Sequence, residues 1–205
     1  MSLAIGANAP DFTVDDDISS FHDWRNGSRA LIVALKALSP TCTTECQTLL
    51  RLKDEFKSRN VKLIALSGDT QDDLGRWSDD LQALFGHGLP CRLVIDHDRT
   101  IATSYDIAAP TAPGGLQRAL FIVAPDGRIE FASCGPVTAG RNFEEILRLI
   151  DSIRLTQRAR VATSAEWRPG DPVWLPPSLP QEEAEQRYGA TLQTFRPYLR
   201  MVPGP

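Results

Sequence analysis

Short apolar runs alternate with segments of helical periodicity along the first three quarters of the chain. Three runs rich in Val, Ile and Leu predict buried central strands, at residues 30–35, 62–66 and 92–95. Residues 43–59 and 72–85 carry apolar side chains at helical spacing, with charged residues on the opposite face. Strands alternating with helices in this way indicate crossover connections within one sheet.

The pattern continues with a short helix over residues 100–105 and then a hairpin. The runs at 119–123 and 129–133 flank a Pro-Asp-Gly sequence at 125–127, which favours a tight turn. An amphipathic helix over 143–154 follows. The order β-α-β-α-β, then a hairpin, then a helix, predicts an α/β protein with a thioredoxin-like core.

The composition changes after Ala162, where five prolines crowd a segment with few periodic apolar residues. The apolar residues Trp167, Trp174 and Leu175 favour a small packed domain over disorder in this segment. A chain of 205 residues is longer than one typical domain and shorter than two. We therefore expect one main domain over residues 1–155 and a small C-terminal α+β domain over residues 156–205.

The charge balance argues against polyanionic partners. Lys and Arg total 22 and Asp and Glu total 26, which gives a net charge of −4. Nucleic acid is therefore not expected to bind. The longest apolar run ends at Lys36, far short of the ~20 residues that span a bilayer, so no membrane span is expected. Residues 1–11 lack the basic and apolar parts of a signal peptide, which predicts a cytoplasmic protein.

Four cysteines, at positions 42, 46, 91 and 134, are expected to be free thiols, metal ligands or redox catalysts in a reducing compartment. No pair has the C-x2-C spacing of a zinc site. The sequence Asp96-His97-Asp98 resembles a ligand set, but three adjacent polar residues after a strand are interpreted as a solvated turn. No phosphate loop or dinucleotide fingerprint is present, so we expect no metal and no cofactor.

Cys42 is the candidate for chemistry because of its place in the chain. The segment Ser-Pro-Thr-Cys-Thr-Thr-Glu, residues 39–45, lies between a buried strand and the first turn of an amphipathic helix. The free N–H groups and the dipole at a helix N-terminus favour a thiolate. Lowering a thiol pKa from ~8.5 to ~6 raises the thiolate fraction at neutral pH by only ~30-fold. Fast chemistry at Cys42 would therefore need further groups.

The segment 39–45 resembles the peroxidatic-cysteine loop of peroxiredoxins. Other segments, in matching order, resemble the one-cysteine, peroxiredoxin 6-like class of that family, from about Ile5 to the C-terminus; they are residues 21–24, 60–67, 140–148 and 160–163. The resemblance implies a thioredoxin-like fold with peroxiredoxin insertions. It also implies a homodimeric thiol-dependent peroxidase that reduces hydrogen peroxide and organic or lipid hydroperoxides.

The same resemblance implies roles for individual residues. Cys42 would attack the terminal peroxide oxygen and become a sulfenic acid, which an external thiol of glutathione or thioredoxin type would reduce. Ser39 matches a hydroxyl residue that hydrogen-bonds the peroxide, and Arg118 matches an arginine that stabilises the thiolate and the developing charge. Glu45 and Arg141 match a supporting pair around the site.

Two positions before Cys42 depart from the family pattern. Leu35 stands where the family has a proline, and Ala34 stands where it has a histidine. The proline shapes the loop and shields the cysteine from water, so we expect reduced but retained activity. Leu35→Pro is expected to raise the rate, provided that the Leu35 N–H is not needed in the sheet.

The remaining cysteines leave alternatives open. Cys46 lies one helical turn after Cys42, and it is either a resolving thiol or a buried structural cysteine. Its position on the apolar helix face favours the structural interpretation, and a disulfide at this spacing would require the helix to unwind. Cys91 and Cys134 adjoin predicted strands and are expected to pack as small hydrophobes.

Two other functions are compatible with the resemblance. A catalytically weakened peroxiredoxin would act as a redox sensor or a chaperone-like dimer, and Leu35 is the feature that favours it. One-cysteine relatives can also carry a phospholipase activity, whose serine, histidine and aspartate match Ser28, His22 and Asp126. Ser28 lacks the flanking glycines that give a lipase-like serine its sharp turn.

Overall fold

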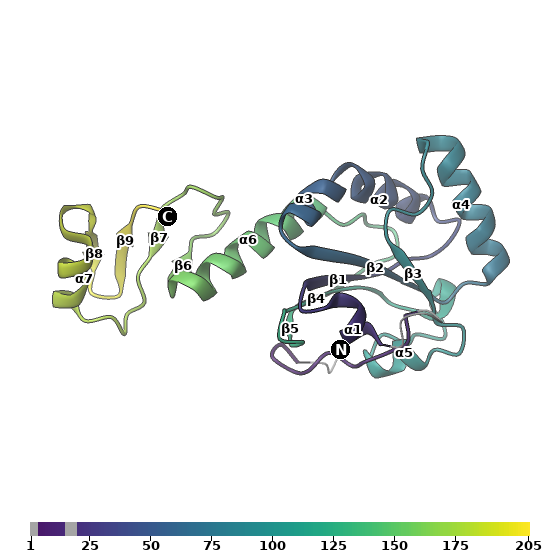
Figure 1. The fold of residues 1–205 in the computed structure, drawn as a ribbon, viewed down its shortest axis with the longest axis horizontal. Helices are drawn as coiled ribbons and strands as arrows, with labels where there is room; N and C mark the ends of the chain where they lie inside the picture. The colour runs from purple at the N-terminus through teal and green to yellow at the C-terminus, as the bar shows by residue number, and fades with distance from the viewer. Residues whose placement is uncertain (1–3, 15–19) are drawn as a thin grey trace. The chain divides into compact units, whose positions relative to one another are not determined.

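The chain divides into two compact units, each with its own buried core. The computed structural model describes residues 4–14 and 20–205. The units are Met1–Arg141 and Asn142–Pro205, so helix α6 (Phe143–Ala159) belongs to the second unit (Figure 1). A domain boundary after residue 155 stays a prediction.

A mixed sheet of five strands, in the order β3-β2-β1-β4-β5, forms the centre of the first unit. Its strands are β1 (Arg29–Ala34), β2 (Val61–Ser67), β3 (Arg92–Ile95), β4 (Arg118–Val123) and β5 (Ile129–Gly135). The first three are parallel to one another, and β4 and β5 are antiparallel additions beside β1. This arrangement confirms the predicted α/β, thioredoxin-like fold.

Helices cover both faces of this sheet (Figure 1). One face carries α2 (Pro40–Arg51), α3 (Lys53–Ser58) and α4 (Gln71–Phe85), and the other carries α1 (Phe21–Arg25) and α5 (Thr100–Ser104). Because both faces are covered, every residue of β1 and of β4 is buried. The strand that leads into Cys42 is therefore held on both sides.

Aromatic side chains fill the core beneath α1 and α5. The rings of Phe12 and Phe21 stack with centroids 4.8 Å apart, and Tyr105 meets Phe121 edge-on at 5.2 Å. Such pairs add about 0.5–1.5 kcal/mol each beyond the burial of their area. Phe121 lies opposite Ile32 in the β1–β4 ladder, so this packing supports the two strands that border the site.

The helix that carries Cys42 begins earlier than the predicted range of residues 43–59. Helix α2 starts at Pro40, because Ser39 is its N-cap and proline is well accommodated in the first turn. The helical chain is interrupted at Leu52, after which α3 begins. Cys42 therefore lies inside the first turn of α2, at the positive end of the helix dipole.

The second unit has the α+β character that the sequence predicts for the C-terminal part. Its four-stranded sheet has the order β6-β7-β9-β8, with helix α7 (Gln181–Tyr188) beside it in sequence. The strands are β6 (Ala162–Thr163), β7 (Val173–Trp174), β8 (Gln193–Arg196) and β9 (Leu199–Val202). Its core contains Leu155, Trp167, Val173, Leu175, Ala184 and Val202.

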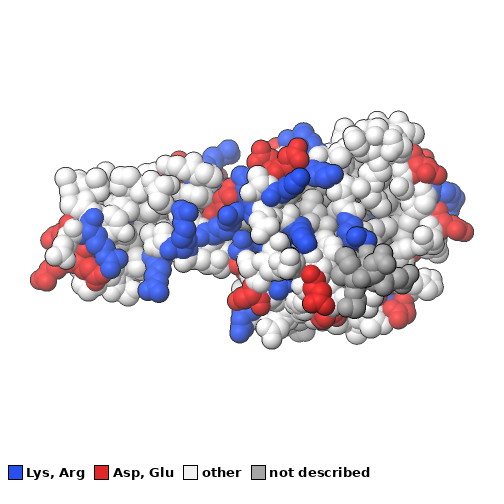
Figure 2. All heavy atoms as spheres, viewed as in Figure 1, with Lys and Arg blue, Asp and Glu red and all other residues white. Residues whose placement is uncertain are grey.

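Both signs of charge occur on the surface of each unit (Figure 2). Lys and Arg are interspersed with Asp and Glu on the face shown, as the net charge of −4 leads one to expect. Among the described residues, no helix is both long enough and apolar enough to cross a membrane.

Leu35 continues the parallel ladder of β1 and β2 beyond the end of β1. Its N–H donates to the carbonyl oxygen of Leu66 at 2.9 Å. The condition attached to Leu35→Pro is therefore not met, because proline has no N–H and would leave this buried carbonyl without its donor. Proline at this position is therefore not expected to raise the rate with peroxide.

We predict instead that Leu35→Pro lowers the free energy of unfolding by about 1–3 kcal/mol, the cost of an unsatisfied buried polar group. Leu35→Met is the control, since it keeps the N–H and a similar volume and is expected to cost less than about 1.5 kcal/mol. Denaturant titration of both variants measures the difference. A Leu35→Pro protein as stable as the parent would show that the Leu66 contact is dispensable.

Candidate active site

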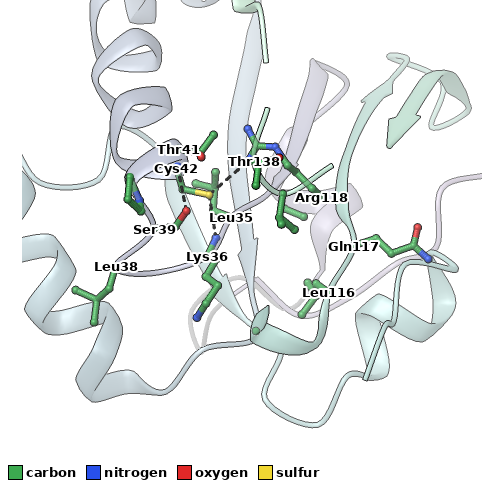
Figure 3. Close-up of a pocket in the computed structure, with 14 residues that line it drawn as sticks. Leu35, Lys36, Leu38, Ser39, Thr41, Cys42, Leu116, Gln117, Arg118 and Thr138 are labelled. Carbon is green, nitrogen blue, oxygen red and sulfur yellow. Dashed lines mark hydrogen bonds between the residues drawn. The ribbon is translucent and has the colours of Figure 1, made fainter. Parts of the chain in front are cut away.

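Cys42 is buried, with 3% of its surface exposed, and two donors reach its sulfur. The backbone N–H of Lys36 donates to Sγ at 3.4 Å, and Nη1 of Arg118 donates to Sγ at 3.6 Å (Figure 3). Hydrogen bonds and a cation near a thiol favour its charged form. The sulfur thus accepts from one peptide group nearby in the sequence and from one guanidinium that is 76 positions away.

Ser39 closes the first turn of α2 beside Cys42. Its Oγ accepts from the Cys42 N–H at 3.5 Å, and its carbonyl accepts from the Thr43 hydroxyl at 2.8 Å. The Thr43 hydroxyl in turn accepts from Nε1 of the buried Trp77, at 2.9 Å. This chain of bonds ties the N-terminus of α2 to α4. The Ser39 side chain also borders the pocket above Cys42 (Figure 3).

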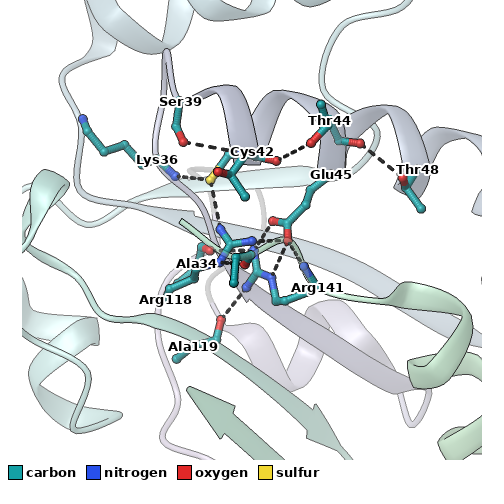
Figure 4. Close-up of polar contacts among 12 residues, drawn as sticks. Ala34, Lys36, Ser39, Cys42, Thr44, Glu45, Thr48, Arg118, Ala119 and Arg141 are labelled. Atoms are coloured by element: carbon teal, nitrogen blue, oxygen red, sulfur yellow. Dashed lines mark hydrogen bonds and ion pairs between the residues drawn. The ribbon is translucent and has the colours of Figure 1, made fainter. Parts of the chain in front are cut away.

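Glu45 lies below Cys42 and is shared by two arginines (Figure 4). Its carboxylate, 3% exposed, accepts from Nη2 of Arg118 and, at 2.6 Å, from Nη2 of Arg141. The Arg141 backbone N–H donates to the same carboxylate at 2.6 Å. Two guanidinium groups and one carboxylate leave one positive charge, which a Cys42 thiolate would neutralise. The cluster therefore places a net positive charge beside the Cys42 sulfur.

Further bonds fix each arginine in place. Nε of Arg118 donates to the Ala139 carbonyl oxygen at 2.9 Å, and Arg141 donates to the carbonyl oxygens of Ala119 and Ala34 at 2.9 and 3.1 Å. The guanidinium planes cannot rotate without losing these bonds. The structure thus brings together the residues to which the resemblance gives roles in peroxide reduction: Ser39, Cys42, Glu45, Arg118 and Arg141.

A pocket of about 470 Å³ opens above Cys42. Most of its lining is apolar, and the exposed side chains of Leu38 and Val137 lie at it. Leu35 is buried and also lines the pocket, so an apolar side chain covers the site at the position where the family pattern has a proline. The complete lining is Ala34, Leu35, Lys36, Leu38, Ser39, Pro40, Thr41, Cys42, Gly114, Leu116, Gln117, Arg118, Val137 and Thr138.

The other three cysteines occupy different surroundings, and all four are free thiols. Burial raises the pKa of the Cys46 thiol, and the neighbouring Cys91 and Cys42 raise it further. Burial also raises the pKa of Cys91, to about 12. Cys134 is exposed, so the expectation that it packs as a hydrophobe is wrong. It lies near the end of β5, an edge strand, with its Sγ 3.2 Å from Oε1 of Gln117.

The residues matching a phospholipase site each form hydrogen bonds with other groups. The Ser28 hydroxyl donates to Oδ1 of Asn60 at 3.0 Å. The His22 ring uses both nitrogens, since Nδ1 accepts from Nε of Arg25 and Nε2 then donates to the Ala9 carbonyl oxygen. His22 therefore has no free nitrogen to take a proton from Ser28.

Asp126 is bound locally as well. Its carboxylate accepts from the Arg128 N–H at 3.0 Å within the hairpin turn. The possible ligand set around Asp96 is also structural, because that carboxylate accepts from the N–H groups of Ile101 and Ala102 at the start of α5.

Two groups at the site were missed from sequence. The Lys36 N–H is a backbone donor, so no side-chain motif marks it. Asp69 accepts from the Lys36 ammonium and from the backbone N–H of the next residue, Ala37. A signal existed, since Ser67 and Asp69 follow the strand predicted beside the one leading to Cys42, and the carboxyl ends of neighbouring parallel strands meet at one edge of the sheet.

Comparison with known proteins agrees with this fold. The model of the AhpC/TSA family matches residues 5–132, and that of the C-terminal domain of 1-Cys peroxiredoxin matches residues 152–191. A 1-Cys peroxiredoxin of Onchocerca volvulus is 36% identical, covering 98% of this chain and 97% of the relative. Peroxiredoxin-6 of Rattus norvegicus is also 36% identical, over 99% and 98% of the two chains.

Solved structures extend the agreement to three dimensions. The yeast mitochondrial 1-Cys peroxiredoxin has a TM-score of 0.87 and 32% identity, covering 98% of this chain and 100% of that one. Peroxiredoxin 6 of Arenicola marina has a TM-score of 0.87 and 35% identity, covering 100% and 99%. The fold and the thiol site define a peroxiredoxin. Within that class, the chain belongs to the 1-Cys peroxiredoxin family.

We predict that Glu45→Gln lowers the free energy of unfolding by about 3–5 kcal/mol, because it removes the buried carboxylate from two guanidinium groups. Glu145→Gln is the matched control, since the Glu145 side chain is 51% exposed and pairs with Arg148 on the surface of α6. That pair is expected to contribute less than about 1 kcal/mol. Denaturant titration distinguishes the two, and equal losses would contradict the structural role of Glu45.

Proposed function

We propose that the thiolate of Cys42 is the nucleophile with which this peroxidase reduces peroxides. The main support for the proposal is the pair of hydrogen bonds that the Cys42 sulfur accepts at the N-terminal turn of α2, one from the Lys36 N–H and one from Arg118. These donors would stabilise the thiolate before reaction and the charge that moves onto oxygen during it. Neither a metal nor an organic cofactor takes part in the reaction we propose.

In the first step the thiolate attacks the terminal oxygen of ROOH. The S–O bond forms as the O–O bond breaks, and the departing alkoxide takes a proton to leave as ROH, which is water when R is hydrogen. Cys42 becomes a sulfenic acid, so sulfur is oxidised by two electrons and the peroxide is reduced by two. We assign Arg118 to stabilise the developing charge and the Ser39 hydroxyl to hydrogen-bond the peroxide, each contributing ~10²–10³ in rate.

In the second step an external thiol attacks the sulfenic acid, releasing water and leaving a mixed disulfide on Cys42. A second thiol then restores Cys42 and leaves as a disulfide with the first. We propose an external reductant because Cys46 is buried on the apolar side of the same helix and has a raised pKa. The yeast relative resolves its thiol through glutathione and thioredoxin systems, and we propose a reductant of that type here.

Hydrogen peroxide and organic or lipid hydroperoxides are the proposed substrates. The pocket of about 470 Å³ is much larger than hydrogen peroxide needs. Its apolar lining, with Leu38 and Val137 exposed, suits the hydrocarbon part of a larger hydroperoxide. Leu35 lines the pocket with an apolar side chain, as the proline of the family pattern would. We therefore favour an enzyme with steady peroxide turnover over a redox sensor.

A homodimer in the cytoplasm completes the proposal. The second unit exposes the large apolar side chains of Phe195 and Tyr198, which suits burial against a second copy. Sedimentation equilibrium measures this association, and a monomer at micromolar concentration would contradict it. Four free cysteines suit a reducing compartment, and cell fractionation tests the location.

We predict that Cys42→Ser abolishes peroxide reduction, because a hydroxyl is a far weaker nucleophile than a thiolate. Cys46→Ser, Cys91→Ala and Cys134→Ala are expected to keep most of the activity. Steady-state turnover with hydrogen peroxide and a simple thiol measures all four variants, with far-ultraviolet circular dichroism to confirm folding. Full activity in Cys42→Ser would disprove the mechanism.

We predict that Arg118→Met slows the reaction of Cys42 with peroxide by ~10² or more, because the charge beside the sulfur is removed. The fold is expected to survive, since Glu45 keeps its bonds to Arg141. Stopped-flow oxidation of the reduced protein measures the rate, and Arg76→Met on the exposed face of α4 is the control. A loss below tenfold, with an unchanged thiol pKa, would make Arg118 structural.

A further inference from the structure

The Lys36 N–H reaches the Cys42 sulfur from a connection that lies outside the sheet. Residues 36 and 37 follow β1 and precede α2, and the last sheet bond on this side is the one from Leu35 to Leu66. A backbone donor in a connecting segment is useful only when the segment is held still. The holding contact is therefore part of what the site requires.

The side chain of Asp69 supplies that contact from the end of β2. Its Oδ1 accepts from Nζ of Lys36 at 2.8 Å, and its Oδ2 accepts from the Ala37 N–H at 2.7 Å. The hydroxyl of Ser67, which is fully buried, donates to Oδ2 at 2.8 Å and orients the carboxylate. One buried carboxylate thus binds both Lys36, whose N–H donates to Sγ, and the next residue, Ala37.

The surroundings of Asp69 leave it little freedom. A Cβ atom added to Gly114, which lines the pocket, would lie 3.4 Å from Oδ1 of Asp69 and 3.7 Å from Cδ of Lys36. The pocket wall at Gly114 therefore packs against the ion pair. Burial alone would raise the pKa of Asp69, but the bonds from Lys36, Ala37 and Ser67 outweigh it and lower the pKa below its usual value. Asp69 is ionised at neutral pH.

We propose that Asp69 is a positioning residue for peroxide reduction: it fixes residues 36 and 37 so that the Lys36 N–H donates to the Cys42 sulfur. The inference rests on the proposed function of Cys42. Asp69 itself touches neither the sulfur nor the space above it in the contacts of the described chain. Asp69 acts on the sulfur only through the backbone of residues 36 and 37, which it holds in position.

An electrostatic role and a positioning role of Asp69 predict opposite changes in the Cys42 thiol pKa when the carboxylate is removed. A negative charge near a thiolate disfavours it, so loss of Asp69 by charge alone would lower the thiol pKa and leave the Lys36 ammonium uncompensated beside the site. Loss of position would release the Lys36 N–H from the sulfur, which raises the thiol pKa and slows the reaction. The sign of the change therefore separates the two roles.

The test uses Asp69→Asn, which keeps the size of the side chain but has only one acceptor oxygen for three donors. Reduced protein is mixed with hydrogen peroxide in a stopped-flow instrument, and the thiol pKa is read from the ultraviolet absorbance of the thiolate. We expect the second-order rate to fall about tenfold or more and the thiol pKa to rise. Ser67→Ala, which removes one bond to Asp69, is expected to shift both in the same direction by less.

Asp80→Ala, an exposed change of the same charge on α4, is the control and is expected to alter neither quantity. An unchanged or faster rate in Asp69→Asn, or a lowered thiol pKa, would overturn the proposal. Reduced stability with unchanged rate and pKa would also overturn it, because Asp69 would then be structural only. If the parent protein itself failed to reduce peroxide, the proposed function would fail, which is a different result from a parent that turns over and an Asp69 variant that matches it.

Discussion

The buried carboxylate of Glu45 is the interaction on which the rest of the site depends. It joins α2, which carries Cys42, to Arg118 at the start of β4 and to Arg141 at the end of the first unit. Three charged side chains below the protein surface are costly unless each is paired and hydrogen-bonded. The cluster meets that condition and still leaves one positive charge beside the sulfur. The stability of this region and the positive charge beside the Cys42 sulfur thus depend on the same groups.

The sheet explains why these groups can meet. Strand β1 runs buried between β2 and β4, so the chain leaves it at a fixed point beside the carboxyl end of β2 and the start of β4. Asp69 follows β2 and binds residues 36 and 37, and Arg118 begins β4 and donates to the sulfur directly. The sulfur lies between these two strand ends. Trp77 secures the first turn of α2 through Thr43. Cys42 and Arg118 are therefore held by a helix and a strand, whereas Lys36 and Arg141 reach the site from connecting segments that their own hydrogen bonds fix in place.

Helices α1 and α7 and the short strands β6 to β9 were not predicted. Hydrophobic periodicity did predict the five strands of the first unit and the order of α2, α4, α5 and α6, because those depend on which residues are buried. It placed the start of the Cys42 helix too late, since Ser39 and Pro40 act through capping rather than periodicity. The contact of Arg118 with Cys42 spans 76 positions, so it was accessible from sequence only through family resemblance. The exposure of Cys134, the Leu35 N–H bond and the grip of Asp69 all depend on which strand lies beside which, a tertiary property that local patterns do not contain.

We expect Cys42 alone to take the peroxide oxygen, because among the four cysteines it alone has both the donors and the positive charge beside its sulfur. The test is intact mass measured after one equivalent of hydrogen peroxide, followed by peptide mapping with a sulfenic acid trap. The expected result is a gain of one oxygen, located on the peptide that contains Cys42. Trapped oxygen on Cys134, or a loss of two hydrogens that signals an internal disulfide, would contradict it.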